Sequence, residues 1–201
     1  MTYFLQTPIS IDQLRRIRTG DILYLSGTLT TCRDVGHRRI TEEKIHSPVD
    51  FKDGAILHAG PIVKKTDNGY EMISIGPTTS MRMEAFEADF IAETGVRVII
   101  GKGGMGSKTA DACRCHGAIH CIYPAGCAVL AATKVERIDQ VYWADLGMPE
   151  SLWVCRVKKF GPLIVSIDTE GNNLFADNYY LFEQQKDAAF ARICNELHFI
   201  K

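Results

Sequence analysis

Three short stretches combine cationic and hydroxyl side chains where a predicted strand ends or a helix begins. They are Thr78-Thr79 with Arg82, Arg33 with His37, and Lys102. Together they offer two guanidiniums, one ammonium and two hydroxyls, which suit a small ligand with two carboxylates. A sugar phosphate would fit nearly as well, so both ligand classes remain open at this point.

Arg82 occupies an unusual place in its predicted helix. Residues 72–75 predict a strand, Gly76-Pro77 ends it, and a helix is expected from the following hydroxyl residues to Thr94, with Gly95 as its stop. A cation in the first turn lies at the positive end of the helix dipole. An anion bound by the free N–H groups and Arg82 would explain this placement. The alternative is that Arg82 points into solvent.

Arg33 and His37 form a second candidate pair. Asp34 can cap a helix that runs to about Lys44. Arg33 at the helix start and His37 four residues later would then project to the same side. A functional pair and an exposed surface both agree with this spacing, whereas a solvated face is the simpler interpretation of Arg38-Arg39.

The stretch Gly101–Gly106 matches G-x-G-x-x-G after a predicted buried strand, 96–100, and before a predicted helix. This pattern suggests a nucleotide-binding module. However, no strand ending in an acidic residue follows about 20 residues on, and Ser107-Lys108 does not complete a phosphate-binding loop. What remains is a backbone that a ligand can approach closely, with Lys102 at the strand end. A glycine-rich turn with a solvated lysine is the alternative.

A second cluster carries possible metal ligands: Cys113, Cys115, His116, His120 and Cys121. Zinc and iron–sulfur sites use better spaced units such as paired C-x-x-C, so we expect no metal site within this chain. Cys127, Cys155 and Cys194 stand among apolar residues and are expected in the core. An odd total of seven cysteines favours reduced thiols and a cytoplasmic location.

The overall composition is that of a globular protein, with 46% hydrophobic and 23% charged residues. The net charge of −1 gives no reason to expect nucleic acid as a partner. No apolar run reaches the roughly 18 residues that indicate a membrane span. The first residues, 1–9, lack the basic region and long apolar run of a signal peptide, so none is expected.

The remaining patterns predict one mixed α/β domain, residues 1–201, with a β-rich core and helices on its face. Strands are expected at 22–25, 28–31, 55–58, 96–100, 140–144, 152–158 and 163–168. A hairpin is expected from Ile62-Val63 to 70–75 across Asp67-Asn68-Gly69. Helices are expected after the capping box Ser10–Gln13 and at 125–133. An amphipathic helix, 177–197, closes the chain with an apolar stripe of Leu181, Phe182, Ala189, Phe190 and Ile193.

The candidate residues do not form a complete catalytic set. The sequence contains no evident pair of catalytic carboxylates, no nucleophile elbow and no metal-ligand set beside the cations. If these residues form an active site, they form half of one.

Four blocks carry a resemblance to a known family: TCRDVGHRR (31–39), HAGP (58–61), GPTTSMRM (76–83) and GKGGM (101–105). They resemble the β subunits of iron–sulfur hydro-lyases, the group of class I fumarate hydratases and L(+)-tartrate dehydratases. Further matching blocks at 127–132, 146–153 and 161–168 extend the resemblance over essentially the whole chain.

The resemblance implies a swivelling β/β/α domain and a separate α subunit. That α subunit would carry a [4Fe–4S] cluster on three cysteines, in an α2β2 complex, and this chain alone would bind no cofactor. The implied reaction removes water from a 2-hydroxy dicarboxylate. L(+)-tartrate would give oxaloacetate, and malate would give fumarate. The residues within the matching blocks favour L(+)-tartrate as the substrate.

The resemblance also implies roles for individual residues. By position, the substrate carboxylates would be bound by Arg33, Thr79, Arg82 and Lys102. Thr78 would be the base, provided that neighbouring cations stabilise its alkoxide. His37 is a second candidate for proton transfer, since imidazole titrates near neutral pH, and the two remain unranked. Met81 departs from the Thr-Thr-Ala-Gly-Arg pattern of fumarate hydratases, so the identity of the substrate stays undecided.

Overall fold

A ring of five strands forms the centre of the computed structural model, which describes residues 1–67 and 69–196. The ring consists of β2 (Ile22–Thr31), β3 (Ala55–Leu57), β6 (Val98–Gly101), β7 (Ile119–Ile122) and β9 (Leu152–Ile167). From β2 to β7 the neighbours pair in parallel, and β9 pairs antiparallel with both β7 and β2. This second pairing of β9 closes a small mixed barrel. Outside it lie β1 (Thr2–Gln6), on β2, and β8 (Val135–Tyr142), on β9.

The central strands β3 and β6 are apolar along their whole length because both of their faces are buried. In β6, Val98 and Ile100 belong to one hydrophobic cluster, whereas Ile99 belongs to a second cluster with Phe90 of the helical layer. This alternation follows from the two-residue period of a strand. It confirms the buried strand predicted at 96–100, although the strand begins at Val98. It also shows that the barrel has one core inside and another beneath its helices.

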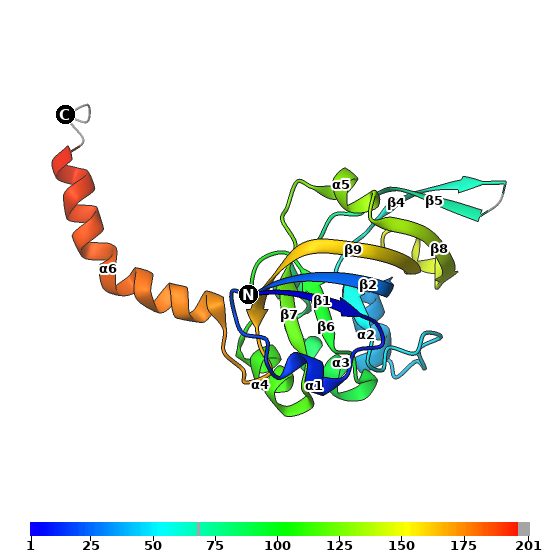
Figure 1. The fold of residues 1–201 in the computed structure, drawn as a ribbon, viewed down its shortest axis with the longest axis horizontal. Coiled ribbons are helices and arrows are strands. Elements are labelled where there is room, and N and C mark those ends of the chain that lie inside the picture. Colours follow the sequence, from blue (N-terminus) through cyan, green and yellow to red (C-terminus); the bar gives the residue numbers. More distant parts are fainter. Residues whose placement is uncertain (68, 197–201) are drawn as a thin grey trace.

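The helices and a hairpin cover opposite sides of the barrel (Figure 1). On one side lie α1 (Ile11–Leu14), α2 (Asp34–Thr41), α3 (Glu87–Thr94) and α4 (Ser107–His116). On the other lie the hairpin of β4 (Ile62–Thr66) and β5 (Gly69–Ser74) and the short α5 (Ala128–Ala132). The short helix η2 (Ala144–Leu146) precedes β9. The mixed α/β class, the capping-box helix and the hairpin are confirmed, although Asn68 of the predicted turn lies outside the described residues.

Two predicted strand breaks are wrong. Residues 22–31 form one strand, β2, because register shifts near Gly27 absorb the glycine within the ladder with β9. Likewise, 152–158 and 163–168 are parts of one strand, β9, and 140–144 falls at the end of the longer β8. Gly27 in β2 and Gly161 in β9 therefore lie within continuous strands and do not end them.

The helix predicted from the hydroxyl residues to Thr94 is interrupted. A short 3-10 helix, η1 (Ser80–Met83), comes first, and α3 follows after a break. Gly95 ends α3 in the left-handed conformation at φ 68°, as predicted. The helix α2 begins directly after Arg33, which takes the cap position expected for Asp34, and it ends at Thr41, before Lys44.

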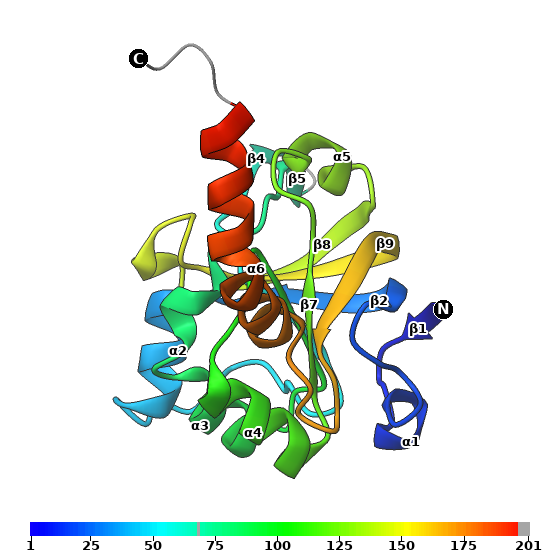
Figure 2. The ribbon, with the colours of Figure 1, turned by 90° about the vertical axis from the view of Figure 1, so that its left-hand side faces the viewer.

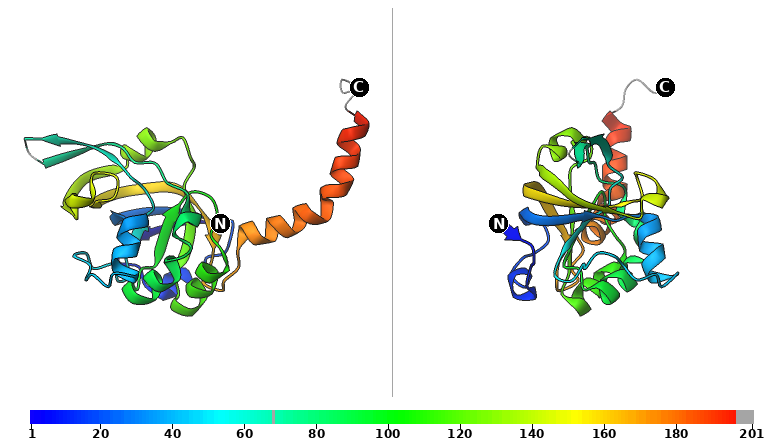
Figure 3. Two further views of the ribbon diagram at one scale, coloured as in Figure 1. Left: turned by 180° about the vertical axis from the view of Figure 1, so that it is seen from behind. Right: turned by 90° about the vertical axis from the view of Figure 1, so that its right-hand side faces the viewer.

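The closing helix α6 (Leu174–Glu196) forms but leaves the body of the molecule (Figures 1 and 2). Figure 3 shows it extending away on the side opposite the β4–β5 hairpin. It has no buried residue, so its predicted apolar stripe is exposed, and the expectation of a core position for Cys194 is wrong. The predicted end of this helix at Leu197 lies outside the described residues. No helix in the described part of the chain is long and apolar enough to cross a membrane.

Candidate functional site

The carboxyl ends of three parallel strands bring the predicted site residues to one edge of the barrel. Arg33 follows β2, His58 follows β3 and Lys102 follows β6. The segment before η1 lies between the last two, because the Thr78 N–H donates to the His58 carbonyl at 2.6 Å and the Lys102 N–H donates to the Thr78 carbonyl at 3.0 Å. We call Arg33, Thr78, Thr79, Arg82 and Lys102 the strand-edge cluster.

Asp34 joins the two arginines of this cluster. Its Oδ2 lies 2.9 Å from Arg82 Nη2 and 3.2 Å from Arg33 Nε. Burial alone would raise the pKa of Asp34, but its own backbone N–H, Arg33 and Arg82 together lower it. Asp34 is therefore ionised at neutral pH and aligns two guanidiniums that would otherwise repel each other.

A second carboxylate orients Arg33. Glu150 Oε1 lies 2.9 Å from Arg33 Nε, and Glu150 Oε2 accepts the Val35 N–H at 3.1 Å. Gly60 allows the guanidinium to lie against the backbone, since a Cβ at this position would stand 2.6 Å from Arg33 Nη1. Both ion pairs of Arg33 use Nε, so its two Nη groups stay available for a ligand as far as the described residues are concerned.

The other members of the cluster face outward. Arg82 Nη1 donates to Thr78 Oγ1 at 3.4 Å, and Thr79 is exposed beside it. Lys102 is half-buried, and its ammonium makes no ion pair with any residue that the structure describes. Met81 is half exposed in the same short helix as Arg82. The edge thus combines three cations, two hydroxyls and two carboxylates, with a net positive charge.

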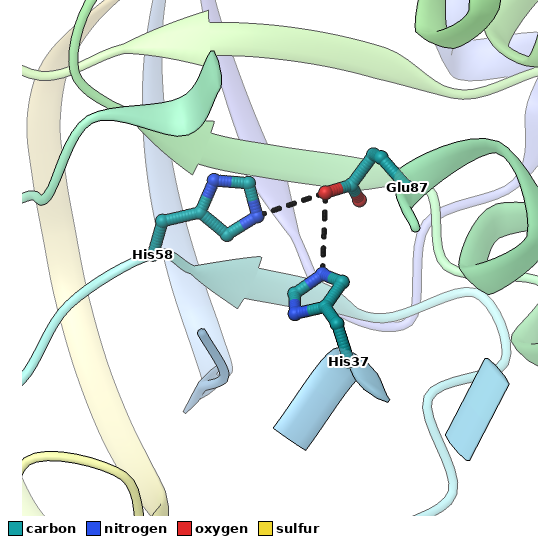
Figure 4. Close-up of side chains that lie close together, drawn as sticks. All are labelled: His37, His58 and Glu87. Carbon is teal, nitrogen blue, oxygen red and sulfur yellow. Dashed lines mark ion pairs between the residues drawn. The ribbon is translucent and has the colours of Figure 1, made fainter. Parts of the chain in front are cut away.

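His37 lies beneath this edge rather than on it. Its side chain is fully buried, and its Nε2 is 3.2 Å from Glu87 Oε2, the same oxygen that His58 Nε2 approaches at 3.1 Å (Figure 4). Burial disfavours the imidazolium, but Cys32 and Glu87 together raise the pKa of His37 well above its ordinary value. The prediction that Arg33 and His37 project to the same side is wrong, because the first turn of α2 points His37 into the interior.

Sequence reasoning missed four residues of this arrangement: Asp34 and Glu150 as partners of Arg33, and His58 and Glu87 beneath it. One sequence signal was present, since Glu87 shares the i, i+3, i+4 face of α3 with Phe90 and Ile91, both fully buried. A carboxylate on an apolar helix face needs a buried partner.

The cysteines of the described chain do not fit an iron–sulfur cluster. Cys113 and Cys121 are buried, Cys115 is exposed, and burial raises the pKa of both buried thiols, which makes thiolate ligands unfavourable. Among the described residues, the group of possible metal ligands that lies close together is His37, His58 and Glu87, which includes no cysteine.

The glycine loop is already occupied by a side chain of the protein. Glu84 accepts the Gly106 N–H at 2.7 Å and the Thr109 hydroxyl at 2.7 Å, at the N-terminus of α4. A dinucleotide would place its phosphate on these N–H groups. Because a carboxylate takes that place, the loop serves to position Lys102 and to begin α4.

The fold and the strand edge together define a class: a swivelling β/β/α domain that presents cations on one open edge of a small barrel. The comparison with protein families agrees with this. The model for the Fumarase C-terminus family matches residues 2–178, and the chain belongs to that family.

Relatives of known name extend the match to the whole chain. The L(+)-tartrate dehydratase subunit beta of Escherichia coli (strain K12) is 59% identical over 201 residues, 100% of both chains. The putative L(+)-tartrate dehydratase subunit beta of Methanocaldococcus jannaschii is 42% identical over 170 residues, 82% of this chain and 86% of the relative. A putative fumarate hydratase class I of Geobacillus stearothermophilus is 37% identical over 174 residues, which are 86% of this chain but 33% of the relative. The resemblance to hydro-lyase β subunits is confirmed.

Proposed function

We propose that this chain is the β subunit of an L(+)-tartrate dehydratase, which removes water from L(+)-tartrate to give oxaloacetate. The observation that carries the proposal is the strand-edge cluster itself, in which Asp34 aligns Arg33 and Arg82 and both Nη groups of Arg33 make no ion pair with a described residue. Full-length identity of 59% to a named tartrate dehydratase β subunit supports this choice of substrate.

The substrate carboxylates bind to the cations of the cluster. A guanidinium offers two parallel N–H groups that match a carboxylate, and Lys102 adds a point charge. Thr79, exposed between Thr78 and η1, adds a hydroxyl donor. With Asp34 and Glu150 bound to Arg33 and Arg82, the edge keeps a net positive charge, so a dianionic substrate is attracted and held against it.

In this proposal Thr78 first releases its hydroxyl proton to solvent, and its alkoxide then accepts the proton from the substrate carbon. Its backbone is fixed on both sides, by the His58 carbonyl and the Lys102 N–H, which sets the direction of the side chain. Arg82 Nη1 already donates to Thr78 Oγ1, and the same N–H stabilises the alkoxide that proton removal requires. His37, fully buried, acts on this site through the residues that it holds in place.

The rest of the site belongs to an α subunit, which we propose carries the [4Fe–4S] cluster. The name subunit beta of the relatives implies such a partner, and in the Geobacillus stearothermophilus chain the matching segment is 33% of a longer protein. Removal of the substrate hydroxyl is the task of that partner. The α2β2 stoichiometry, the cytoplasmic location and the single-domain organisation of residues 1–201 stay predictions.

A class I fumarate hydratase β subunit is the second candidate, favoured by the 37% identity to the Geobacillus stearothermophilus protein. Both reactions use the same cations to bind the substrate. Met81, beside Arg82, can select between the two substrates because its size narrows the space next to these cations. A panel of L-tartrate, D-tartrate, meso-tartrate, malate and fumarate on the α–β complex tests the choice. We expect the highest kcat/KM with L-tartrate, and a preference for malate or fumarate would select the second candidate.

A further inference from the structure

A chain of fully buried polar side chains runs behind the strand-edge cluster. We call it the buried histidine network, and its members in order of contact are Ser166, His120, Ser80, His58, Glu87 and His37. The side-chain contacts are 2.5, 3.0, 3.1, 3.1 and 3.2 Å along that order. Polar groups buried this completely must satisfy one another.

The end of the network at His37 requires a charge. Its Nδ1 lies 3.5 Å from Cys32 Sγ, a weak donor or acceptor, and 3.0 Å from the Arg33 carbonyl, which can only accept a hydrogen bond. The closer carbonyl would repel a bare nitrogen, so Nδ1 carries a proton. Its Nε2 faces Glu87 Oε2, also an acceptor, so Nε2 carries a proton as well. An imidazole protonated on both nitrogens is an imidazolium, and Glu87 is its carboxylate partner.

Glu87 also receives His58, and this fixes the direction of the remaining hydrogen bonds. The contacts of His37 Nε2 and His58 Nε2 with Glu87 Oε2 are electrostatic and do not have hydrogen-bond geometry. In the described part of the chain, these two nitrogens and both carboxylate oxygens of Glu87 have no hydrogen-bond partner. A bare Nε2 against a carboxylate would be repelled, so His58 keeps its proton there and its Nδ1 accepts the Ser80 hydroxyl.

The same direction continues to the far end. Ser80 accepts from His120 Nε2, and His120 Nδ1 accepts the Ser166 hydroxyl. Both histidines are then neutral, which agrees with burial lowering the pKa of His58 and lowering that of His120 to about 3. The opposite direction, with Ser166 donating to the His120 carbonyl at 3.2 Å, would leave His58 Nε2 bare against Glu87.

The network touches every backbone segment that carries the strand-edge cluster. The Arg33 carbonyl accepts both the backbone N–H and the ring Nδ1–H of His37. The His58 carbonyl accepts the Thr78 N–H, and the Ser80 N–H donates to the Lys102 carbonyl at 2.9 Å. Gly101 makes room for the junction, because a Cβ there would lie 1.8 Å from Ser80 Oγ.

We propose that Glu87 is a positioning residue for the dehydration reaction, which with the His37 imidazolium holds Arg33, Thr78 and Lys102 in register for the substrate. This rests on the proposed function. Neither Glu87 nor His37 reaches the surface, so neither contacts substrate. Because the cations are already held in place, substrate binding does not have to order them first. Loss of the Glu87 charge therefore weakens substrate binding more than turnover.

The test compares Glu87→Gln with Glu93→Gln in the α–β complex. Glu93 lies on the same helix, but on the surface, where it pairs with Lys44 at 2.6 Å. Glutamine at 87 keeps the shape but loses the charge, and we expect KM for L-tartrate to rise by about tenfold or more with a smaller change in kcat. Glu93→Gln is expected to match the wild type. An unchanged KM in a folded Glu87→Gln complex would overturn the proposal.

Nitrogen NMR of isotope-labelled histidine in the full chain provides a readout that needs no activity. At neutral pH we expect His37 protonated on both ring nitrogens, and His58 and His120 protonated on Nε2 only. A neutral His37 would overturn the proposal, as would a stoichiometric metal ion that is lost in Glu87→Gln, because the ring lone pairs would then bind metal.

If Glu87→Gln fails to fold, Ser80→Ala serves instead, since it removes one buried hydroxyl and breaks the chain between His58 and His120. We expect a raised KM, with His58 still protonated on Nε2 because Glu87 remains, and an unchanged KM would count against the proposal. A complex without tartrate activity would refute the proposed function alone, because the NMR signature of His37 is independent of it.

Discussion

Asp34 Oδ2 lies 2.9 Å from Arg82 Nη2, so a residue at the start of α2 aligns a guanidinium 48 positions later in the chain. The same oxygen is 3.2 Å from Arg33 Nε. Two like charges are thereby held side by side at neutral pH, in an arrangement ready for two carboxylates.

Arg82→Ala is expected to impair substrate binding first. A hydrogen bond to a charged group contributes about 1.5–3 kcal/mol, which corresponds to a rise in KM of about 10- to 100-fold. Arg39→Ala is the matched control, because Arg39 pairs with Asp145 away from the cluster. Steady-state kinetics of the α–β complex measure both, and equal KM values for the two variants would contradict the role of Arg82.

Thr78→Ala is expected to reduce turnover. Loss of a positioned proton acceptor lowers kcat by about 10²- to 10⁴-fold, while KM changes little because Arg33, Arg82 and Lys102 remain. Thr78→Ser keeps the hydroxyl and should retain most of the activity. Near-normal kcat in Thr78→Ala would assign the proton transfer to another residue, on this chain or on the partner.

Asp34→Asn should remove a pH-dependent part of the stability. The pKa of Asp34 is lowered in the folded chain, so its ionised form stabilises the fold above the unfolded pKa, about 3.9, and this contribution is lost as pH falls through the lowered pKa. The difference in free energy of unfolding between wild type and variant should therefore be constant near neutral pH and shrink on acidification. A difference that grows on acidification would contradict the assignment.

Calorimetry of the chain with NAD, NADP and ATP is expected to show no binding. Glu84 occupies the N–H groups of Gly106 and Thr109 that a phosphate would need. Glu84→Ala should lower the free energy of unfolding by about 1 kcal/mol, as loss of a helix cap does, without producing nucleotide affinity. Micromolar binding to the wild-type chain would revive the nucleotide-binding module.

The shared edge of Arg33 and Lys102 could be predicted from the sequence, because each follows a strand of the parallel part of the sheet. Arg82 follows the separate hairpin, and the backbone hydrogen bonds of Thr78 bring its segment to that edge. The carboxylate partners of the two arginines could not be predicted. Glu150 reaches Arg33 across 117 positions, and only the antiparallel return of β9 places it there. Nothing local in the sequence reports such a pairing.

The placement of His37 and of α6 illustrates two further limits. His37 shares a helical turn with Arg33, but the burial of Phe90 and Glu87 beside it decides which way the ring points. The apolar stripe of α6 predicts a helix correctly, but the spacing of apolar residues does not show what the apolar face contacts. Both outcomes depend on tertiary structure.

Reconstitution of the two subunits tests the central claim most directly. The rate of oxaloacetate formation from L-tartrate should be measured for this chain alone, for the α subunit alone, and for the two together under anaerobic conditions. We predict that activity appears only in the mixture and saturates at a fixed ratio of the subunits. Tartrate dehydration by either subunit alone, or an inactive mixture that nevertheless forms a complex, would contradict an active site shared between them.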